Sequence, residues 1–133
     1  MKILAIVFAF CFVGTLAFSN SIKAKVERFR ASCITETSID PKLIQGAKEG
    51  IISKADERLG CYTYCMLRKK GIVEENGRLW VNIAKRQLIT YGADALMADE
   101  MVNKCKNIAG GNECKQASNL IQCFLEIRSS YIF

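Results

Sequence analysis

Residues 61–67 read CYTYCML, and this stretch decides how the chain folds. Cys61 and Cys65 lie four positions apart within an apolar pattern of helical period, so they share one helix face, one turn apart. Their Cβ atoms are then roughly 6 Å apart, which is beyond disulfide reach. Once oxidised, each must bond to a cysteine elsewhere in the chain. We therefore expect this helix to be the hub of the fold.

The N-terminus has the pattern of a secretory signal peptide. Residues 1–19 combine a positive start, an uncharged apolar run from Ile3 to Phe18 and small residues near the expected cleavage site. The run is short for a bilayer span, and an uncleaved anchor helix is the alternative. Cys11, one of seven cysteines, leaves with the signal. The even number that remains predicts a disulfide framework in a secreted protein.

Residues 20–133 have the length of one domain. Without Lys2, 18 basic and 13 acidic residues remain, so the mature chain carries a net charge of about +5, scattered along its length. The one compact basic run, residues 68–70, precedes Gly71 at the expected end of a helix, where cations complement the helix dipole. No aromatic residues interleave with it. We expect neither nucleic-acid binding nor stable membrane insertion.

Apolar residues recur at helical spacing along the mature chain, without sustained alternation of period two, so the predicted class is all-α. A first helix around Ile22 to Cys33 ends at a break over residues 38–41. Asp40 and Pro41 then open a second helix. The second helix is expected to end near Gly50, and a third helix to run from Ile52 to Gly71. A turn at residues 74–77 precedes a fourth helix from Leu79 to Tyr91–Gly92. The fifth helix is expected to carry the apolar stripe Met97, Met101, Cys105 and Ile108 and to end at Gly110–Gly111, and the sixth to run from its cap Asn112 to Ile127.

Helix geometry reduces the disulfide pairings without deciding among them. Six cysteines allow fifteen connectivities. A bond between Cys61 and Cys65 is excluded, and Cys114 and Cys123 lie about 13 Å apart along one predicted helix, which excludes that bond too. Ten connectivities remain.

The cysteine spacing resembles that of the insect odorant-binding protein family, which includes the pheromone-binding and general odorant-binding proteins. Three residues separate the second and third cysteines, and eight separate the fifth and sixth. The contexts of residues 61–67, 71–77 and 113–117 also resemble family sequence. The resemblance spans the mature chain and implies a six-helix, disulfide-stapled bundle around an apolar cavity. It implies the bonds Cys33–Cys65, Cys61–Cys114 and Cys105–Cys123, a set among the ten.

The resemblance further implies a secreted carrier of small hydrophobic ligands, such as odorants, pheromones or related semiochemicals, in chemosensory lymph or another body fluid. We expect no cofactor and no metal. Flexible methionines suit a pocket that adapts to several ligand shapes, although ordinary core packing is the alternative for every apolar candidate. The candidates for the pocket wall are Phe29, Tyr62, Met66, Trp80, Ile83, Leu88, Met97, Met101, Leu120, Phe124 and Phe133.

Two further features bear on function. Residues 129–133 end the chain with apolar side chains, predicted as a lid or floor of the pocket with a frayed terminus as the alternative. The sequence contains no histidine, which removes the usual general base and the usual zinc ligand, so we expect no enzyme. It also removes the histidine-driven ligand release of some family members. Any pH switch would have to use carboxylates such as Glu126, Asp99 or Glu100.

Other functions stay open from the sequence. A secreted interaction module with a collapsed cavity is one, and a general lipid or hormone carrier outside chemosensation is another. A membrane-active, saposin-like protein also pairs six cysteines on helices, but such chains are shorter and space their cysteines differently. A chemosensory receptor and a second copy of the chain are the protein partners that the sequence leaves open.

Overall fold

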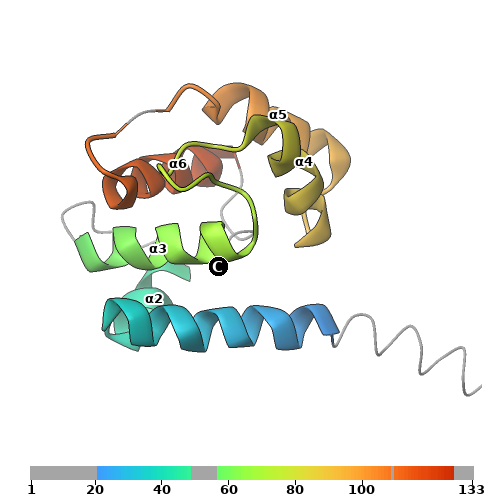
Figure 1. Ribbon diagram of the computed structural model, residues 1–133. Coiled ribbons are helices and arrows are strands. Elements are labelled where there is room, and N and C mark those ends of the chain that lie inside the picture. The colour runs from blue at the N-terminus through green and yellow to red at the C-terminus, as the bar shows by residue number, and fades with distance from the viewer. Residues whose placement is uncertain (1–20, 49–56, 109, 128–133) are drawn as a thin grey trace, which may run out of the picture.

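The computed structural model describes residues 21–48, 57–108 and 110–127, which form an all-helical bundle (Figure 1). The N-terminal helix spans residues 21–37. The other helices are α2 (Pro41–Lys48), α3 (Glu57–Lys69), α4 (Val81–Thr90), α5 (Ala95–Cys105) and α6 (Glu113–Ile127). The N-terminal helix, α3 and α6 lie in three layers with α3 in the middle, and α4 and α5 lie at one end of α6. The predicted all-α class is confirmed.

The N-terminal helix and α2 are separated by the break that the sequence predicts. Ser38 has a left-handed backbone, with φ of 55°, and ends the first of these helices. The Asp40 carboxylate caps α2 by accepting a hydrogen bond from the Lys42 amide at 2.9 Å. Pro41 occupies the first helical position, where the missing amide hydrogen removes no helical bond. The predicted end of α2 near Gly50 lies outside the described residues.

Two disulfides join α3 to the helices on either side of it, and a third joins α5 to α6. The bonds and their Cα–Cα distances are Cys33–Cys65 at 5.7 Å, Cys61–Cys114 at 4.3 Å and Cys105–Cys123 at 5.9 Å. The first joins the N-terminal helix to α3, the second joins α3 to α6, and the third joins the end of α5 to α6. The pairing that the resemblance implied is confirmed, and so is the hub role of α3. The predicted start of this helix at Ile52 lies outside the described residues.

The backbones of α3 and α6 come close together at Gly60. A Cβ atom added there would lie 2.7 Å from the carbonyl oxygen of Cys114. Only glycine permits so close an approach. The neighbouring bond between Cys61 and Cys114 fastens the same crossing. Gly60 therefore permits the close approach of α3 and α6, and the disulfide holds the two helices at that distance.

The loop between α3 and α4 closes through an isolated antiparallel bridge between Val73 and Leu79. The turn that the sequence predicts at residues 74–77 lies between these two residues and is confirmed. The predicted start of the fourth helix at Leu79 is wrong by two residues. Leu79 pairs across the loop, so α4 begins at Val81.

Local signals set most of the remaining helix ends. Asp94 caps α5 by accepting a hydrogen bond from the Met97 amide at 2.8 Å, a cap that the sequence analysis missed. Asn112 accepts one from the Lys115 amide at 2.8 Å, so the predicted cap of α6 is confirmed. Gly92, with φ of 119°, follows the end of α4 as expected.

Gln116 of α6 holds the loop that follows α5. Its side-chain amide donates a hydrogen bond to the Ile108 carbonyl oxygen at 2.9 Å, and its side-chain oxygen accepts one from the Gly110 amide at 3.2 Å. These contacts shape the loop, and α5 ends at Cys105. The predictions that Ile108 continues the helix and that Gly110–Gly111 closes it are therefore wrong.

Buried apolar side chains form two clusters, with α3 contributing to both. The N-terminal cluster contains Cys33, Ile39, Ile44, Leu59, Tyr62 and Met66, with Val26 and Phe29 packed against it. The C-terminal cluster lies mainly among α4, α5 and α6, and its larger members include Leu67, Ile72, Val73, Leu88, Met97, Met101, Leu120, Ile121 and Phe124. The middle helix thus separates two small cores.

Gly60→Ala is expected to lower the free energy of unfolding by about 1 to 3 kcal/mol, because the new methyl group would overlap a backbone carbonyl held by the adjacent disulfide. Gly111→Ala is the matched control, since nothing lies within 4 Å of its Cβ position. Guanidinium denaturation of the oxidised proteins measures both. Equal stability of the two variants would contradict the close approach of α3 and α6.

Candidate functional site

The predicted pocket-wall residues do not form one group. Phe29, Tyr62 and Met66 lie in the N-terminal cluster, between the N-terminal helix and α3. The buried candidates of the C-terminal cluster are Leu88, Met97, Met101, Leu120 and Phe124. The structure therefore divides the predicted wall into two apolar surfaces, each built on a different set of helices.

Among the described wall candidates, Trp80 and Ile83 belong to neither cluster. Trp80 precedes α4 as its N-cap residue and is 37% exposed, which fits the rim of a site rather than its interior. Ile83 lies in the first turn of α4 and is half-buried. Phe133 lies outside the described residues, so its role stays a prediction.

Lys70, directly after α3, is a buried cation. The residue is only 5% exposed. Its Nζ atom lies 5.5 Å from the centre of the Tyr91 ring at the end of α4, within range of a cation–π interaction. Burial, and secondly the Arg30 guanidinium, lower the pKa of the Lys70 ammonium group from 10.5 to about 8. The ammonium group thus lies where two effects oppose its charge.

A second cation and a buried hydroxyl accompany Lys70. Arg30, in the N-terminal helix, acts electrostatically on both Lys70 and Tyr62, and it pairs with the Glu27 carboxylate at 2.7 Å. Tyr62 is 1% exposed, so its hydroxyl is buried. Burial raises the pKa of this hydroxyl, although the Arg30 charge and a side-chain hydrogen bond to Arg30 act in the opposite direction. The Lys70 ammonium, the Arg30 guanidinium and the Tyr62 hydroxyl therefore lie beside the apolar N-terminal cluster.

The sequence predicts Arg68, Lys69 and Lys70 as cations at a helix end. Arg68 and Lys69 lie in the last turn of α3, and Lys70 follows directly, its amide donating a hydrogen bond to the Met66 carbonyl oxygen at 3.0 Å, so this placement is confirmed. The burial of Lys70 was not predicted. The signal that was missed is spacing, because Tyr62, Met66 and Lys70 recur every four residues and continue one face of the helix.

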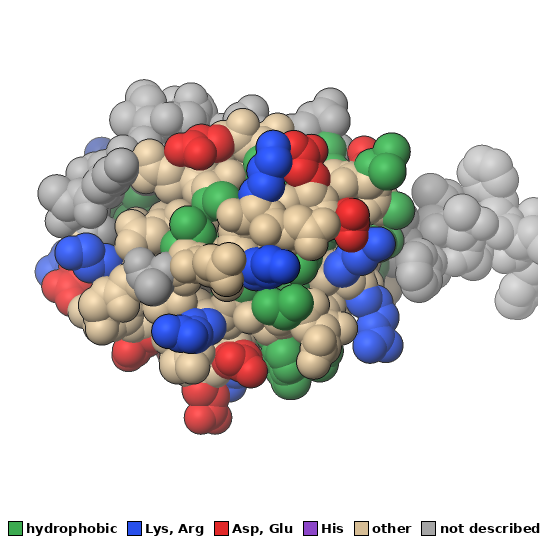
Figure 2. Space-filling view, turned by 90° about the horizontal axis from the view of Figure 1, so that it is seen from above, with side chains coloured by type: hydrophobic (Ala, Val, Ile, Leu, Met, Phe, Trp, Pro, Cys, Tyr) green, Lys and Arg blue, Asp and Glu red, His purple; other side chains and the backbone are tan. Residues whose placement is uncertain are grey.

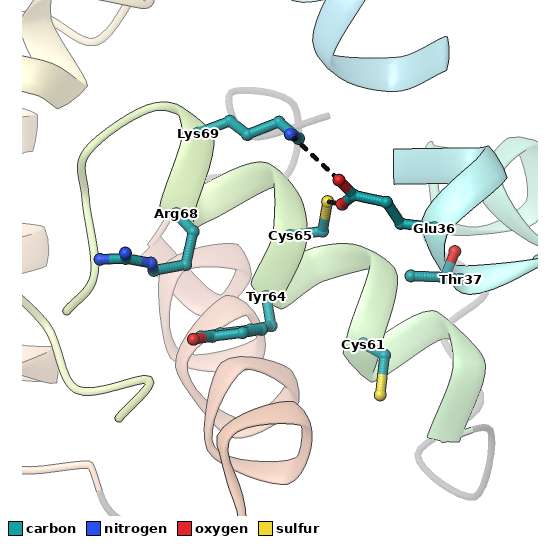
Figure 3. A pocket seen from close by; sticks show the side chains of 7 residues that line it. All are labelled: Glu36, Thr37, Cys61, Tyr64, Cys65, Arg68 and Lys69. Atoms are coloured by element: carbon teal, nitrogen blue, oxygen red, sulfur yellow. Dashed lines mark hydrogen bonds and ion pairs between the residues drawn. The ribbon is translucent and has the colours of Figure 1, made fainter. Parts of the chain in front are cut away.

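A surface hollow of about 300 Å³ lies between the end of the N-terminal helix and α3 (Figure 3). Its lining residues are Glu36, Thr37, Cys61, Tyr64, Cys65, Arg68 and Lys69. The two carboxylate oxygens of Glu36 lie 2.9 Å from Cys65 Sγ and 3.5 Å from Lys69 Nζ. Cys33 and Cys65 adjoin this carboxylate, but their sulfurs form a disulfide and offer no thiolate to a metal. This charged, open hollow suits neither an apolar ligand nor a metal ion.

The surface above α5 and α6 carries charges of both signs. In Figure 2, acidic and basic side chains alternate on this face with scattered hydrophobic ones, and no continuous basic surface is visible there. Ion pairs on and near α5 include Lys85 with Asp99 at 3.5 Å and Lys104 with Glu100 at 2.8 Å. Among the described residues, no helix is long and apolar enough to cross a bilayer. The dispersed charge seen in the sequence is thus also dispersed over this face.

The sequence matches known proteins along nearly its whole length. Residues 15–127 match the PBP/GOBP family. Odorant-binding protein 22 of Aedes aegypti is 27% identical over 134 aligned positions, which cover 99% of this chain and 95% of that protein. General odorant-binding protein 56a of Drosophila melanogaster is 27% identical over 117 positions, which cover 84% of this chain and 78% of that one.

Solved structures share the fold. Odorant binding protein 5 of Apis mellifera has a TM-score of 0.75 at 22% identity, over 86% of this chain and 94% of its own. A fatty acid binding protein, OBP56a, from the oral disk of the blowfly Phormia regina has a TM-score of 0.64 at 19% identity, over 80% and 90% of the two chains. At these identities the likeness concerns the arrangement of helices.

Lys70→Met is expected to raise the free energy of unfolding at pH 7 and to lose this advantage in alkaline solution. An ammonium group whose pKa falls from 10.5 to about 8 on folding costs about 3 kcal/mol below pH 8. The cost shrinks as the pH rises from about 8 towards 10.5, because the unfolded chain then holds more protons than the folded one. Between pH 7 and about 9.5, the difference from the unmodified protein should shrink by about 2 kcal/mol.

Lys69→Met is the matched control for that comparison. Lys69 is the preceding residue, but its side chain is partly exposed and pairs with Glu36. Its substitution should shift stability by a small amount that varies little over this pH range. A Lys70→Met difference that stays constant with pH would argue against a buried, titrating ammonium group.

Proposed function

Because this chain belongs to the PBP/GOBP family, we propose that it is a secreted carrier that binds small hydrophobic ligands, such as odorants, pheromones or related semiochemicals, in an internal apolar pocket. The observation that carries the proposal is the family match over residues 15–127, together with the three disulfides that hold the same stretch in its fold. The relatives that match along the chain are odorant-binding proteins by name.

The binding chemistry in this proposal is burial of apolar surface. A ligand of roughly ten to sixteen carbons gains about 0.8 kcal/mol for each methylene group removed from water, enough for micromolar affinity after the entropic costs of binding. Met66 in the N-terminal cluster and Met97 and Met101 in the C-terminal cluster supply flexible, polarisable side chains. Such side chains adapt to ligands of several shapes.

The carrier role requires no reaction. The family consists of odorant-binding proteins, and the sequence offers no histidine for acid–base chemistry. We therefore infer that the protein is not an enzyme.

Secretion is part of the same proposal. Residues 1–19 have the features of a signal peptide, which leaves residues 20–133 as the mature helical domain. Delivery to a chemosensory receptor and formation of a homodimer are proposals for the partners of that domain. A second candidate function is a general lipid carrier outside chemosensation. It is favoured by the blowfly relative, which is described as a fatty acid binding protein of the oral disk.

The purified, oxidised domain is expected to take up an apolar naphthylamine fluorophore saturably and to release it to some long-chain alcohols, esters, aldehydes, fatty acids or terpenoids at micromolar concentration. Fluorescence displacement measures this and ranks the ligand classes. The reduced and alkylated chain is the control, since it lacks the bonds that hold the helices around a pocket. If the folded, oxidised protein takes up no probe, the protein-interaction alternative gains the support that the carrier loses.

Affinity for a neutral ligand such as dodecanol is expected to change by less than about twofold between pH 7.5 and 5.5. The sequence has no histidine, the side chain whose ordinary pKa lies in that interval, and the pKa of Lys70, at about 8, lies above it. The same displacement assay at several pH values measures the affinity. A loss of tenfold or more over this interval would reveal a titrating switch and contradict the expectation.

A further inference from the structure

The hollow between the N-terminal helix and α3 contains both cysteines that fasten α3 to its neighbours. Cys61 and Cys65 are two of its lining residues (Figure 3). Cys65 is half-buried, whereas its disulfide partner Cys33 is completely buried. The volume of the hollow, about 300 Å³, admits a small molecule. A reagent that enters it therefore reaches the bond between Cys33 and Cys65 from the Cys65 side.

A carboxylate lies against the accessible sulfur. Oε2 of Glu36 is 2.9 Å from Cys65 Sγ, and Oε1 of Glu36 is 3.5 Å from Lys69 Nζ. A disulfide sulfur carries no hydrogen to donate, so the contact places a negative charge beside the sulfur. Arg68 points away from Cys65 in Figure 3, and its guanidinium lies 3.8 Å from the Glu75 carboxylate. Among the lining residues, Glu36 and Lys69 are therefore the charged groups that face this sulfur.

The reaction open to a disulfide at such a place is exchange with a thiolate. A thiolate RS⁻ that attacks Cys65 Sγ forms a new S–S bond, and the bond to Cys33 breaks with its electron pair on the Cys33 sulfur, which takes a proton from water. A second thiolate then attacks the attached sulfur, so that Cys65 leaves as a thiolate and the small thiol is oxidised to RSSR.

Glu36 opposes the first of these steps. The attacking thiolate brings a negative charge to Cys65, and the Glu36 carboxylate already lies beside that atom. For two like charges about 4 Å apart in water, the repulsion lowers a rate about fivefold. Lys69 offsets part of this repulsion through its ion pair with Glu36.

We propose that this hollow is a thiol–disulfide exchange site, that Cys65 Sγ is the atom attacked by a small aliphatic thiol, and that the Glu36 carboxylate limits the rate of attack. The inference concerns the reactivity of the fold and stands apart from the proposed carrier function. It depends on the position of one carboxylate beside one disulfide.

The attacked bond is the disulfide that holds the N-terminal helix against α3. The other two bonds join α3 to α6 and α5 to α6. Exchange at Cys65 would therefore release the N-terminal helix and remove a restraint from the N-terminal cluster, which lies between that helix and α3. Glu36 thus protects one of the two small cores against opening by thiols.

The oxidised protein is treated with 2-mercaptoethanol at about pH 8, quenched with acid at intervals and mapped by mass spectrometry. Of the two sulfurs in this bond, Cys65 is expected to carry the attached thiol. Glu36→Gln should raise the initial rate of its attachment about fivefold. Glu27→Gln is the matched control, because it removes a paired carboxylate from the same helix, about 13 Å further along the axis, and should leave the rate unchanged.

Salt and the charge of the thiol separate a charge effect from a packing effect. In about 1 M salt, the rate increase caused by Glu36→Gln should fall to about twofold or less. At low salt the increase should be larger with 2-mercaptoethanesulfonate, which carries a second negative charge, than with the cationic thiol cysteamine. Each thiol is compared with itself, so differences between the thiol pKa values cancel.

The bond between Cys105 and Cys123, far from the hollow in the sequence, is the internal reference in every sample. Its rate of exchange should be the same in the Glu36→Gln protein and the unmodified one. Equal acceleration there would assign the change to a general loosening of the fold and overturn the inference. Attachment of the thiol to Cys33, equal rates for Glu36→Gln and Glu27→Gln, or an increase that persists undiminished in 1 M salt would overturn it as well.

Discussion

The structure depends on α3 being fastened on two sides. Cys61 and Cys65 lie one turn apart and cannot bond to each other, so one bond reaches the N-terminal helix and the other reaches α6. Gly60 allows the second of these contacts, because no larger residue fits between the two backbones. Once α3 is held in this way, the remaining helices can only pack around it. The layered arrangement of the bundle follows from that constraint.

A central helix also divides the apolar core. A domain of this size ordinarily builds one core, and dividing it makes each part small. Disulfides supply stability that two small cores do not, each contributing about 2 to 4 kcal/mol by restricting the unfolded chain. The fold can therefore accept an unfavourable group in its interior, as it does with Lys70. The same stability would allow the apolar pocket of the proposed carrier, since an open pocket also lowers stability.

The sequence predicted helix ends correctly where residues next to each other in the chain decide them. The break before Pro41, the end of α4 before Gly92 and the cap at Asn112 each depend on neighbouring residues, and each prediction is confirmed. The errors arise where contacts distant in sequence decide, as at Ile108, whose carbonyl oxygen is bound by the Gln116 side chain. The burial of Lys70 after α3 also depends on contacts distant in sequence, since Tyr91 of α4 and Arg30 of the N-terminal helix lie near it. The sequence therefore indicated apolar residues that are mostly buried, but not that they divide between two clusters.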